Sequence, residues 1–327
     1  MNKSAKLLAG AAGVTALAAG VSYAVTRFFI RLALDREQPA VVTKATELVG
    51  GTRNWLGEEL TEQIRVGMER LAADPGEEVT LTGFDGTRLV GHWKRPSRPK
   101  RVLIAMHGWR SDWKRDFALA SLFWEQEDCA VLYAEQRGQG NSGGDHMGFG
   151  LTERFDCAQW ARWAVEETGG ALPVYLCGIS MGATTVLMAS ALPLPEQVTG
   201  IMADCGFTSP HAIWRHVTEH NLHLPYGLRA PYIDRIYREK LGLGDANYST
   251  VEALAENTRP VLFIHGAADT FVPVEMTYEN YAACKAPRDL LIVPGAGHGL
   301  SYCVEEEKYK QTVREFWEKY DERKREE

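Results

Sequence analysis

The sequence predicts an α/β protein with a mostly parallel β-sheet, and three observations predict it. Short, continuous apolar runs recur along the chain from residue 102 onward. Patterns with helical periodicity separate these runs, which is typical of a parallel sheet covered by helices on both faces. One run leads directly into a G-x-S-x-G pentapeptide at residues 178–182, and a helix-forming stretch follows it.

Composition is that of an ordinary globular protein. The 327 residues are 45% hydrophobic and 24% charged, so a sizeable core is available. The net charge is −7 and no basic stripe interleaved with aromatic residues occurs, so nucleic acid is not an expected partner. The six cysteines form no C-x-x-C pair, and their spacing predicts no zinc site.

The first 34 residues differ from the rest. Lys3 and Lys6 precede twenty uncharged residues at 7–26, about enough for a helix to cross a bilayer. We expect residues 1–34 to form an apolar helix that anchors the chain in a membrane by a single pass. Residues 22–24 also resemble a signal-peptidase site, so a cleaved signal followed by secretion is the alternative, and a soluble helix is a third possibility. Basic residues flank both ends, so the orientation is not predicted.

The next two segments lead into the main domain, which we expect over residues 78–327. Residues 35–77 carry apolar side chains at helical spacing, interrupted by a Gly-Gly pair, and are predicted to form a helical neck. Apolar alternation at 79–81 and 88–93 around an Asp-Gly pair predicts an antiparallel hairpin.

The remaining strands and helices follow from the apolar pattern. Strands are expected at 102–106, 130–134, 174–177, 198–203, 261–264 and 290–293. Helices are expected at 151–167, 273–285 and 305–319. Residues 206–258 interrupt this alternation, are rich in His, Trp and Tyr, and are predicted to form a helical lid.

Ser180 is the predicted nucleophile. It is central in G-x-S-x-G between an apolar strand and a helix, the arrangement of a nucleophile elbow. The sharp turn exposes the hydroxyl at the sheet edge, at the positive end of a helix. Acyl transfer by a serine also needs a base, a carboxylate that orients the base, and donors for the oxyanion.

Candidates for each of these groups lie at strand ends. Asp269 follows the strand at 261–264 and is the predicted acid, with Asp204 as the alternative. His298, in a glycine-rich loop after the last strand, is the predicted base and completes the chain order Ser, Asp, His. The N–H groups of Met181 and Trp109 are the predicted oxyanion-hole donors. The Trp109 indole is expected either to wall the acyl pocket or to pack in the core.

Two further motifs are interpreted as structural. Residues 135–142 form a glycine-rich loop in which Arg137 is expected to brace neighbouring loops rather than contact substrate. His216 and His220 fit the H-x-x-E-H pattern of zinc peptidases. No clear third ligand follows them and a complete serine apparatus is present, so we expect chance spacing on a lid helix and no metal.

Taken together, these motifs resemble those of serine hydrolases of the α/β-hydrolase superfamily. The match covers about residues 78–320 and includes the segments 107–109, 137–142, 178–182, 265–269 and 297–298. Residues 204–210, together with the N-terminal segment, are similar to a membrane-anchored bacterial branch near the Bem46-like and serine-aminopeptidase-like hydrolases. The resemblance implies the α/β-hydrolase fold with an eight-stranded sheet, a triad of Ser180, Asp269 and His298, and no cofactor. It implies no particular substrate.

We therefore expect a serine hydrolase that cleaves carboxylic esters through an acyl-enzyme. The lid aromatics Trp214, Tyr226 and Tyr232 suggest a small-molecule ester with an apolar acyl group. A peptidase or thioesterase with the same triad, and an acyltransferase, are alternatives; a peptidase for free N-termini should place acidic groups near the pocket. A non-catalytic, membrane-tethered scaffold is the alternative from another class.

Overall fold

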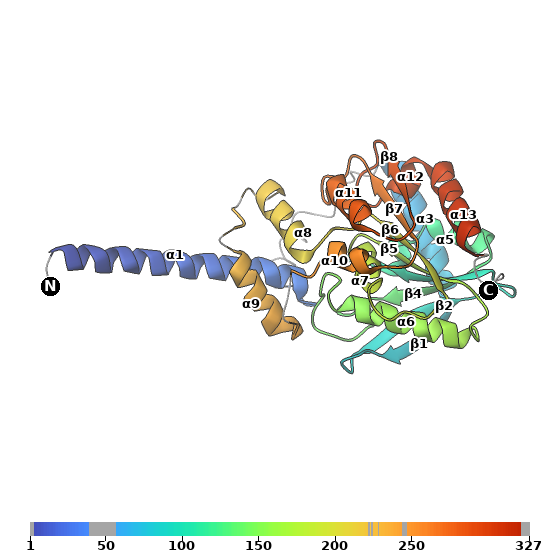
Figure 1. Ribbon diagram of the computed structural model, residues 1–327, viewed down its shortest axis with the longest axis horizontal. Coiled ribbons are helices and arrows are strands. Elements are labelled where there is room, and N and C mark those ends of the chain that lie inside the picture. The colour runs from blue at the N-terminus through green and yellow to red at the C-terminus, as the bar shows by residue number, and fades with distance from the viewer. Residues whose placement is uncertain are drawn as a thin grey trace.

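The computed structural model describes residues 3–38, 57–221, 223, 225–227, 229–243 and 247–321. These residues build an eight-stranded sheet in the order β1-β2-β4-β3-β5-β6-β7-β8 (Figure 1). The strands are β1 Glu77–Thr82, β2 Arg88–Lys94, β3 Arg101–Met106, β4 Cys129–Glu135, β5 Val174–Ile179, β6 Val198–Asp204, β7 Val261–Gly266 and β8 Arg288–Val293. β1, β2 and β4 pair antiparallel, whereas β4, β3 and β5 to β8 pair parallel. The predicted hairpin and mostly parallel sheet are confirmed.

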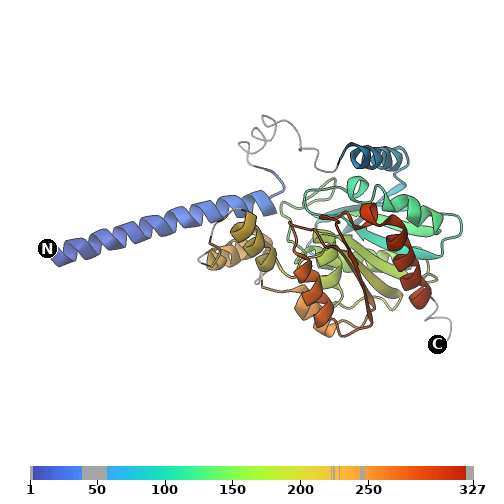
Figure 2. The same cartoon turned by 90° about the horizontal axis from the view of Figure 1, so that it is seen from above.

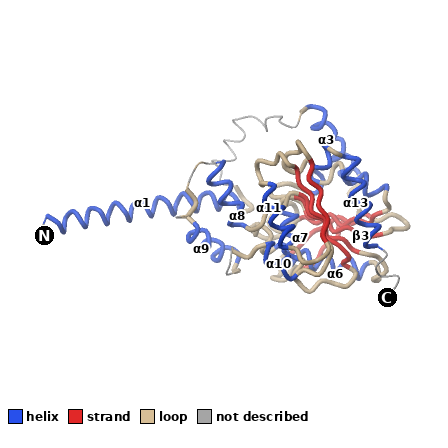
Figure 3. Tube along the Cα trace, turned by 45° about the horizontal axis from the view of Figure 1, so that its top comes forward, coloured by secondary structure: helices blue, strands red, loops and turns tan. Residues whose placement is uncertain are grey.

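Helices cover both faces of the sheet, as expected. One face carries α6 Glu153–Glu167, α7 Met181–Ala189, α10 Thr250–Glu256 and α11 Val274–Ala283. The other carries α3 Glu58–Ala73, α4 Trp113–Asp116, α5 Ala120–Gln126, α12 Ser301–Val304 and α13 Glu306–Asp321. Figure 3 shows the strands between these two sets of helices.

The continuous apolar strands are explained by this double coverage. In β3, Val102, Ile104 and Met106 belong to the core cluster on one face, whereas Leu103 and Ala105 belong to the cluster on the other. Successive side chains of a strand point to opposite faces, so a strand buried on both faces must be apolar throughout. This arrangement brings the carboxyl ends of β3, β5, β7 and β8 to one edge, where the candidate site lies.

The predicted lid segment divides into two parts. α8 Pro210–His216, the π-helix η1 Val217–Asn221 and α9 Ala230–Leu241 pack in a core cluster that also contains Met181, the first residue of α7. α10 instead belongs to the covering layer, because Leu254 is fully buried in the core cluster on the α7 face. Ser209 caps α8 through its hydroxyl and Pro210 occupies the first turn, which is a favourable start for a helix.

The N-terminal helix α1, Lys3–Leu34, projects from the body, and its C-terminal part packs against α9 from Tyr23 onward (Figures 1 and 2). There Ile30, Ala33 and Leu34 are buried in a third core cluster together with Ile233 and Ile236 of α9.

The predicted membrane anchor and neck lie only partly within the described residues. Most side chains of the apolar segment 7–26, and residues 39–56 of the predicted neck, lie outside them. In the part of the chain that is described, no helix combines the length and the apolar character needed to cross a bilayer.

Candidate active site

Ser180 lies in the sharp turn between β5 and α7. Its φ is 55°, a left-handed value that is uncommon outside glycine. The flanking glycines permit this turn: a Cβ on Gly178 would lie 2.2 Å from Gly182 O, and one on Gly182 would lie 1.9 Å from Met106 O. Neither side chain could be accommodated, so the elbow requires glycine at both positions.

The structure brings together the three residues predicted as a triad. His298 Nε2 lies 2.9 Å from Ser180 Oγ, and His298 Nδ1 lies 2.6 Å from Asp269 Oδ2. The second Asp269 oxygen accepts the N–H groups of Phe271 and Val272 at 2.8 and 2.9 Å. This arrangement can remove the hydroxyl proton and stabilise the resulting imidazolium.

The Asp269 carboxylate is buried and stays ionised. Burial alone would raise its pKa, but hydrogen bonds from His265 and His298 outweigh this effect and hold the pKa well below its ordinary value. The alternative acid, Asp204, accepts a hydrogen bond from Ser301 Oγ at 3.1 Å instead of one from His298. Burial raises the pKa of Asp204 to about 6. Asp269 is therefore the carboxylate that contacts the imidazole.

His265 supports Asp269 and was not predicted to do so. Its Nε2 lies 2.9 Å from Val272 O and 3.2 Å from Asp269 Oδ2, while Nδ1 lies 2.7 Å from Thr277 Oγ1. Since a carbonyl can only accept, Nε2 carries the proton and Nδ1 accepts the Thr277 hydroxyl. The signal in the sequence was its place four residues before Asp269, at the end of an apolar strand.

The loop after β3 holds the candidate oxyanion donor Trp109. Gly108 N–H donates to Asp116 Oδ2 at 2.6 Å, and Gly108 O lies 2.8 Å from His107 Nδ1. His107 Nε2 accepts the N–H of Gln136, so Nδ1 carries the proton and donates to Gly108 O. The peptide bond between Gly108 and Trp109 is trans, so its N–H lies opposite its carbonyl group. The Trp109 N–H therefore points away from the His107 ring.

The two candidate donors are free to bind an oxyanion. In the described part of the chain, Trp109 N–H donates to no acceptor, and Met181 N–H is the first of α7, where a helix leaves its N–H groups without internal partners. A Cβ built on Gly108 would lie 3.4 Å from Ser180 Cβ, so the loop is in contact with the nucleophile. Their role as an oxyanion hole stays a prediction.

A cavity of about 490 Å³ opens over the candidate nucleophile. Its walls combine apolar side chains with a few polar groups, as in sites for small molecules. The groups that bear on chemistry are Trp109, Asp116, Ser180, Asp204, Phe271 and His298.

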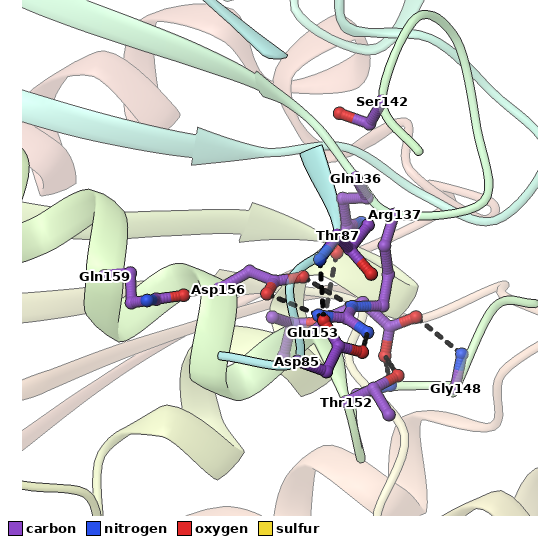
Figure 4. Close-up of polar contacts among 12 residues, drawn as sticks. Asp85, Thr87, Gln136, Arg137, Ser142, Gly148, Thr152, Glu153, Asp156 and Gln159 are labelled. Atoms are coloured by element: carbon purple, nitrogen blue, oxygen red, sulfur yellow. Dashed lines mark hydrogen bonds and ion pairs between the residues drawn. The ribbon is translucent and has the colours of Figure 1, made fainter. Parts of the chain in front are cut away.

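Arg137 is buried away from this cavity and braces three segments (Figure 4). It forms ion pairs with Asp156 of α6 at 2.6 Å and with Asp85 of the β1–β2 turn at 2.7 Å. Burial raises the pKa of Asp156 to about 6, although the guanidinium opposes that rise. Nearby, Glu153 accepts the N–H groups of Gly148 and Gly150. These contacts agree with the expected bracing role of the loop.

The H-x-x-E-H histidines lie on the lid. His216 and His220 stack with ring centroids 4.6 Å apart, and His216 Nε2 lies 3.2 Å from Thr270 O. Among the described residues, the one group of three or more metal-ligating side chains whose ligand atoms all lie within 4.8 Å of one another is Cys205, Asp269 and His298. Burial raises the pKa of the Cys205 thiol, which makes it a poor metal ligand, and the other two are the candidate acid and base.

Part of the chain is similar in sequence to a family of hydrolases. A sequence model of the family described as serine aminopeptidase, S33, matches residues 97–224. The uncharacterized protein YqkD of Bacillus subtilis is 25% identical over 72% of this chain and 75% of its own length. YfhR of Escherichia coli K12, also uncharacterized, is 26% identical over 68% of this chain and 73% of its own length.

Among solved structures, the Pyrococcus furiosus esterase PF2001 superposes with a TM-score of 0.62. It is 22% identical, and the alignment covers 75% of this chain and 91% of the esterase, which shows a shared fold. The family match supports a hydrolase. The chain therefore has the α/β-hydrolase fold, and its residues 97–224 match a family of hydrolases.

Proposed function

We propose that this protein is a serine hydrolase that cleaves carboxylic esters through an acyl-enzyme intermediate. The observation that carries the proposal is the hydrogen-bonded chain from Ser180 Oγ through His298 to Asp269. A serine hydroxyl next to an imidazole that is oriented by a buried carboxylate is an activated nucleophile.

The chemistry follows from this arrangement. Ser180 Oγ attacks the ester carbonyl carbon while His298 Nε2 takes the hydroxyl proton, and the N–H groups of Trp109 and Met181 stabilise the oxyanion. His298 then gives its proton to the leaving alkoxide, which departs as an alcohol and leaves an acyl-serine. A water molecule, deprotonated by His298, attacks the acyl-serine, and release of the acid restores the hydroxyl.

The hydrogen bonds and burial of the carboxylates in the cavity favour ester hydrolysis over aminopeptidase activity. A substrate with a free α-amine needs an unengaged carboxylate near the nucleophile. Of the cavity carboxylates named above, Asp116 already accepts the Gly108 N–H and the Ser111 hydroxyl, and Asp204 accepts the Ser301 hydroxyl. Asp116 is therefore engaged through both oxygens, and Asp204 is buried with 7% of its surface exposed, so neither offers an open, unengaged carboxylate to an ammonium group.

The proposal is tested by hydrolysis of p-nitrophenyl butyrate and by labelling with a fluorophosphonate probe. The wild-type protein should show both, and Ser180→Ala should show neither. A correctly folded wild-type protein that neither turns over the ester nor takes up the probe would favour the non-catalytic scaffold. Hydrolysis of alanine p-nitroanilide at a rate above that of the ester would favour the peptidase.

We also propose, from the sequence of residues 7–26, that the N-terminal segment holds the protein at a membrane as a single-pass anchor. Carbonate extraction of cell membranes tests it, since an anchored full-length chain stays in the pellet. Recovery of a shortened chain from the medium would favour a cleaved signal.

A further inference from the structure

A second cavity, of about 230 Å³, lies between α1, the lid and the oxyanion loop. α1 supplies Phe29, Ile30 and Ala33, and the lid supplies Trp214 and Ile233. The remaining side, next to the active site, is formed by Trp109. The cavity is thus lined mainly by hydrophobic side chains from three parts of the chain, with Thr26, Thr218 and Arg229 also at its surface, and it has no role in the proposed chemistry.

Trp109 connects this cavity to the reaction centre. The residue lines both the second cavity and the larger one that contains Ser180 and His298. Its backbone N–H is the candidate oxyanion donor, so the carbonyl group of a bound ester lies next to it. A chain that reaches the second cavity from that carbonyl must pass the indole.

The α1 wall is fixed to the body by directed contacts. The Trp109 indole N–H donates to Ala33 O at 2.8 Å. Arg110 donates to Leu32 O at 2.7 Å and to Asp35 O at 2.6 Å, so it satisfies carbonyl groups that the end of the helix leaves free. Lys240 of α9 pairs with the Asp35 carboxylate at 2.5 Å. The wall therefore has a defined position relative to the oxyanion loop.

We propose that this second cavity binds the acyl chain of the ester substrate and that α1 is part of the substrate site. The inference rests on the proposed ester hydrolysis. A methylene group takes up roughly the 30 Å³ of a water molecule, so the cavity holds about six to eight carbons. The ligand class is therefore an ester of a medium-length fatty acid. Each methylene that enters the cavity should raise kcat/KM by about three- to fourfold.

The test is a chain-length profile of kcat/KM on p-nitrophenyl esters from acetate to dodecanoate. Ile30→Trp fills the cavity and should lower the ratio of octanoate to butyrate at least tenfold. Phe29→Ala enlarges it and should move the preferred chain length upward by two carbons or more. Val21→Trp is the matched control, because Val21 lies on the same helix with 56% of its surface exposed, and the ratio should stay at its wild-type value.

A binding measurement makes the test independent of catalysis. Ser180→Ala protein should bind octanoic acid in isothermal titration calorimetry, and adding Ile30→Trp should weaken that binding at least tenfold. Identical binding with and without Ile30→Trp would overturn the inference, whatever the ester assay gives. Ester turnover with an unchanged profile in both cavity variants would also overturn it, while leaving the proposed function intact. Absent turnover with cavity-dependent binding would overturn the function alone.

Discussion

His265 Nε2 lies 3.2 Å from Asp269 Oδ2, the same oxygen that lies 2.6 Å from Nδ1 of the candidate base. Two imidazoles thus share one carboxylate oxygen. The side chains of His265 and Asp269 are both fully buried, so water does not screen the interaction between them. His265 is therefore a positioning residue for the acid.

We expect His265→Ala to lower kcat about tenfold or more with little change in KM, because a hydrogen bond to a charged group contributes about 1.5–3 kcal/mol. Steady-state kinetics on p-nitrophenyl butyrate measure both constants. His265→Gln, which keeps an N–H donor, should recover part of the loss. Thr277→Val removes only the hydroxyl that Nδ1 accepts and should cost less than His265→Ala. Wild-type kcat in His265→Ala would show that Asp269 needs no second imidazole.

Asp116 orients the oxyanion loop, since its carboxylate accepts the Gly108 N–H at 2.6 Å. We expect Asp116→Ala to lower kcat by about 10- to 100-fold, less than the roughly 10²–10³ that follows complete loss of an oxyanion donor. Asp112→Ala is the matched control from the same loop. Asp112 caps α4 through the N–H groups of Lys114 and Arg115, so its loss should cost about 1 kcal/mol of stability and leave kcat unchanged. Equal kcat losses in both variants would mean that Asp116 acts only on loop stability.

Gly182 is required by packing, because a Cβ there would meet the backbone of β3 at Met106 O. We expect Gly182→Ala to lower the free energy of unfolding by about 1–3 kcal/mol, the usual cost of overpacking, and to lower probe labelling of Ser180. Gly227→Ala is the control, since nothing lies within 4 Å of a Cβ at that position. Denaturant titration measures the stability, and unchanged stability in Gly182→Ala would show that the elbow can shift.

Much of the fold could be predicted from the sequence because its signals are local. Continuous apolar runs gave the parallel strands, and one Asp-Gly turn gave the hairpin β1–β2. The sequence did not predict that α10 covers the sheet, although α10 lies within the predicted lid range. Only the residues that pack on Leu254 show that this helix belongs to the core. The contacts of α1 with the oxyanion loop were missed for the same reason: Trp109 and Ala33 are far apart in the chain and share no pattern.

In the candidate site too, residues marked by a local motif could be predicted, whereas residues defined by long-range contacts could not. Ser180, Asp269 and His298 could be named because each follows a strand in a distinctive motif, and the structure brings them into contact. The supporting residues His265 and Asp116 were missed in these roles. Their functions depend on three-dimensional contacts with a carboxylate and a backbone N–H, which residue types and spacing do not reveal.

Asp204 is expected to make the stability of the protein depend on pH. Burial raises the pKa of this carboxyl to about 6 from an ordinary value of 3.8. Between about pH 4 and 6, Asp204 is therefore protonated in the folded protein but ionised in the unfolded chain. This difference makes the free energy of unfolding fall as pH rises through that window. This rise in pKa corresponds to about 2–3 kcal/mol of folding stability lost on ionisation. Relaxation of the site should reduce the loss to about 1–2 kcal/mol.

We expect Asp204→Asn to unfold at a higher temperature than the wild-type protein at pH 7–8, because the amide carries no charge to bury and its oxygen can still accept the Ser301 hydroxyl. The gain should shrink as pH falls from 7 to 4, where the wild-type carboxyl is protonated. Thermal melts at half-unit pH steps measure it. Ser301→Ala is the control, and its effect should be larger at pH 7 than at pH 4, since it removes a hydrogen bond to the ionised form. A stability difference between Asp204→Asn and wild type that is constant from pH 4 to 8 would show that Asp204 titrates at an ordinary pH.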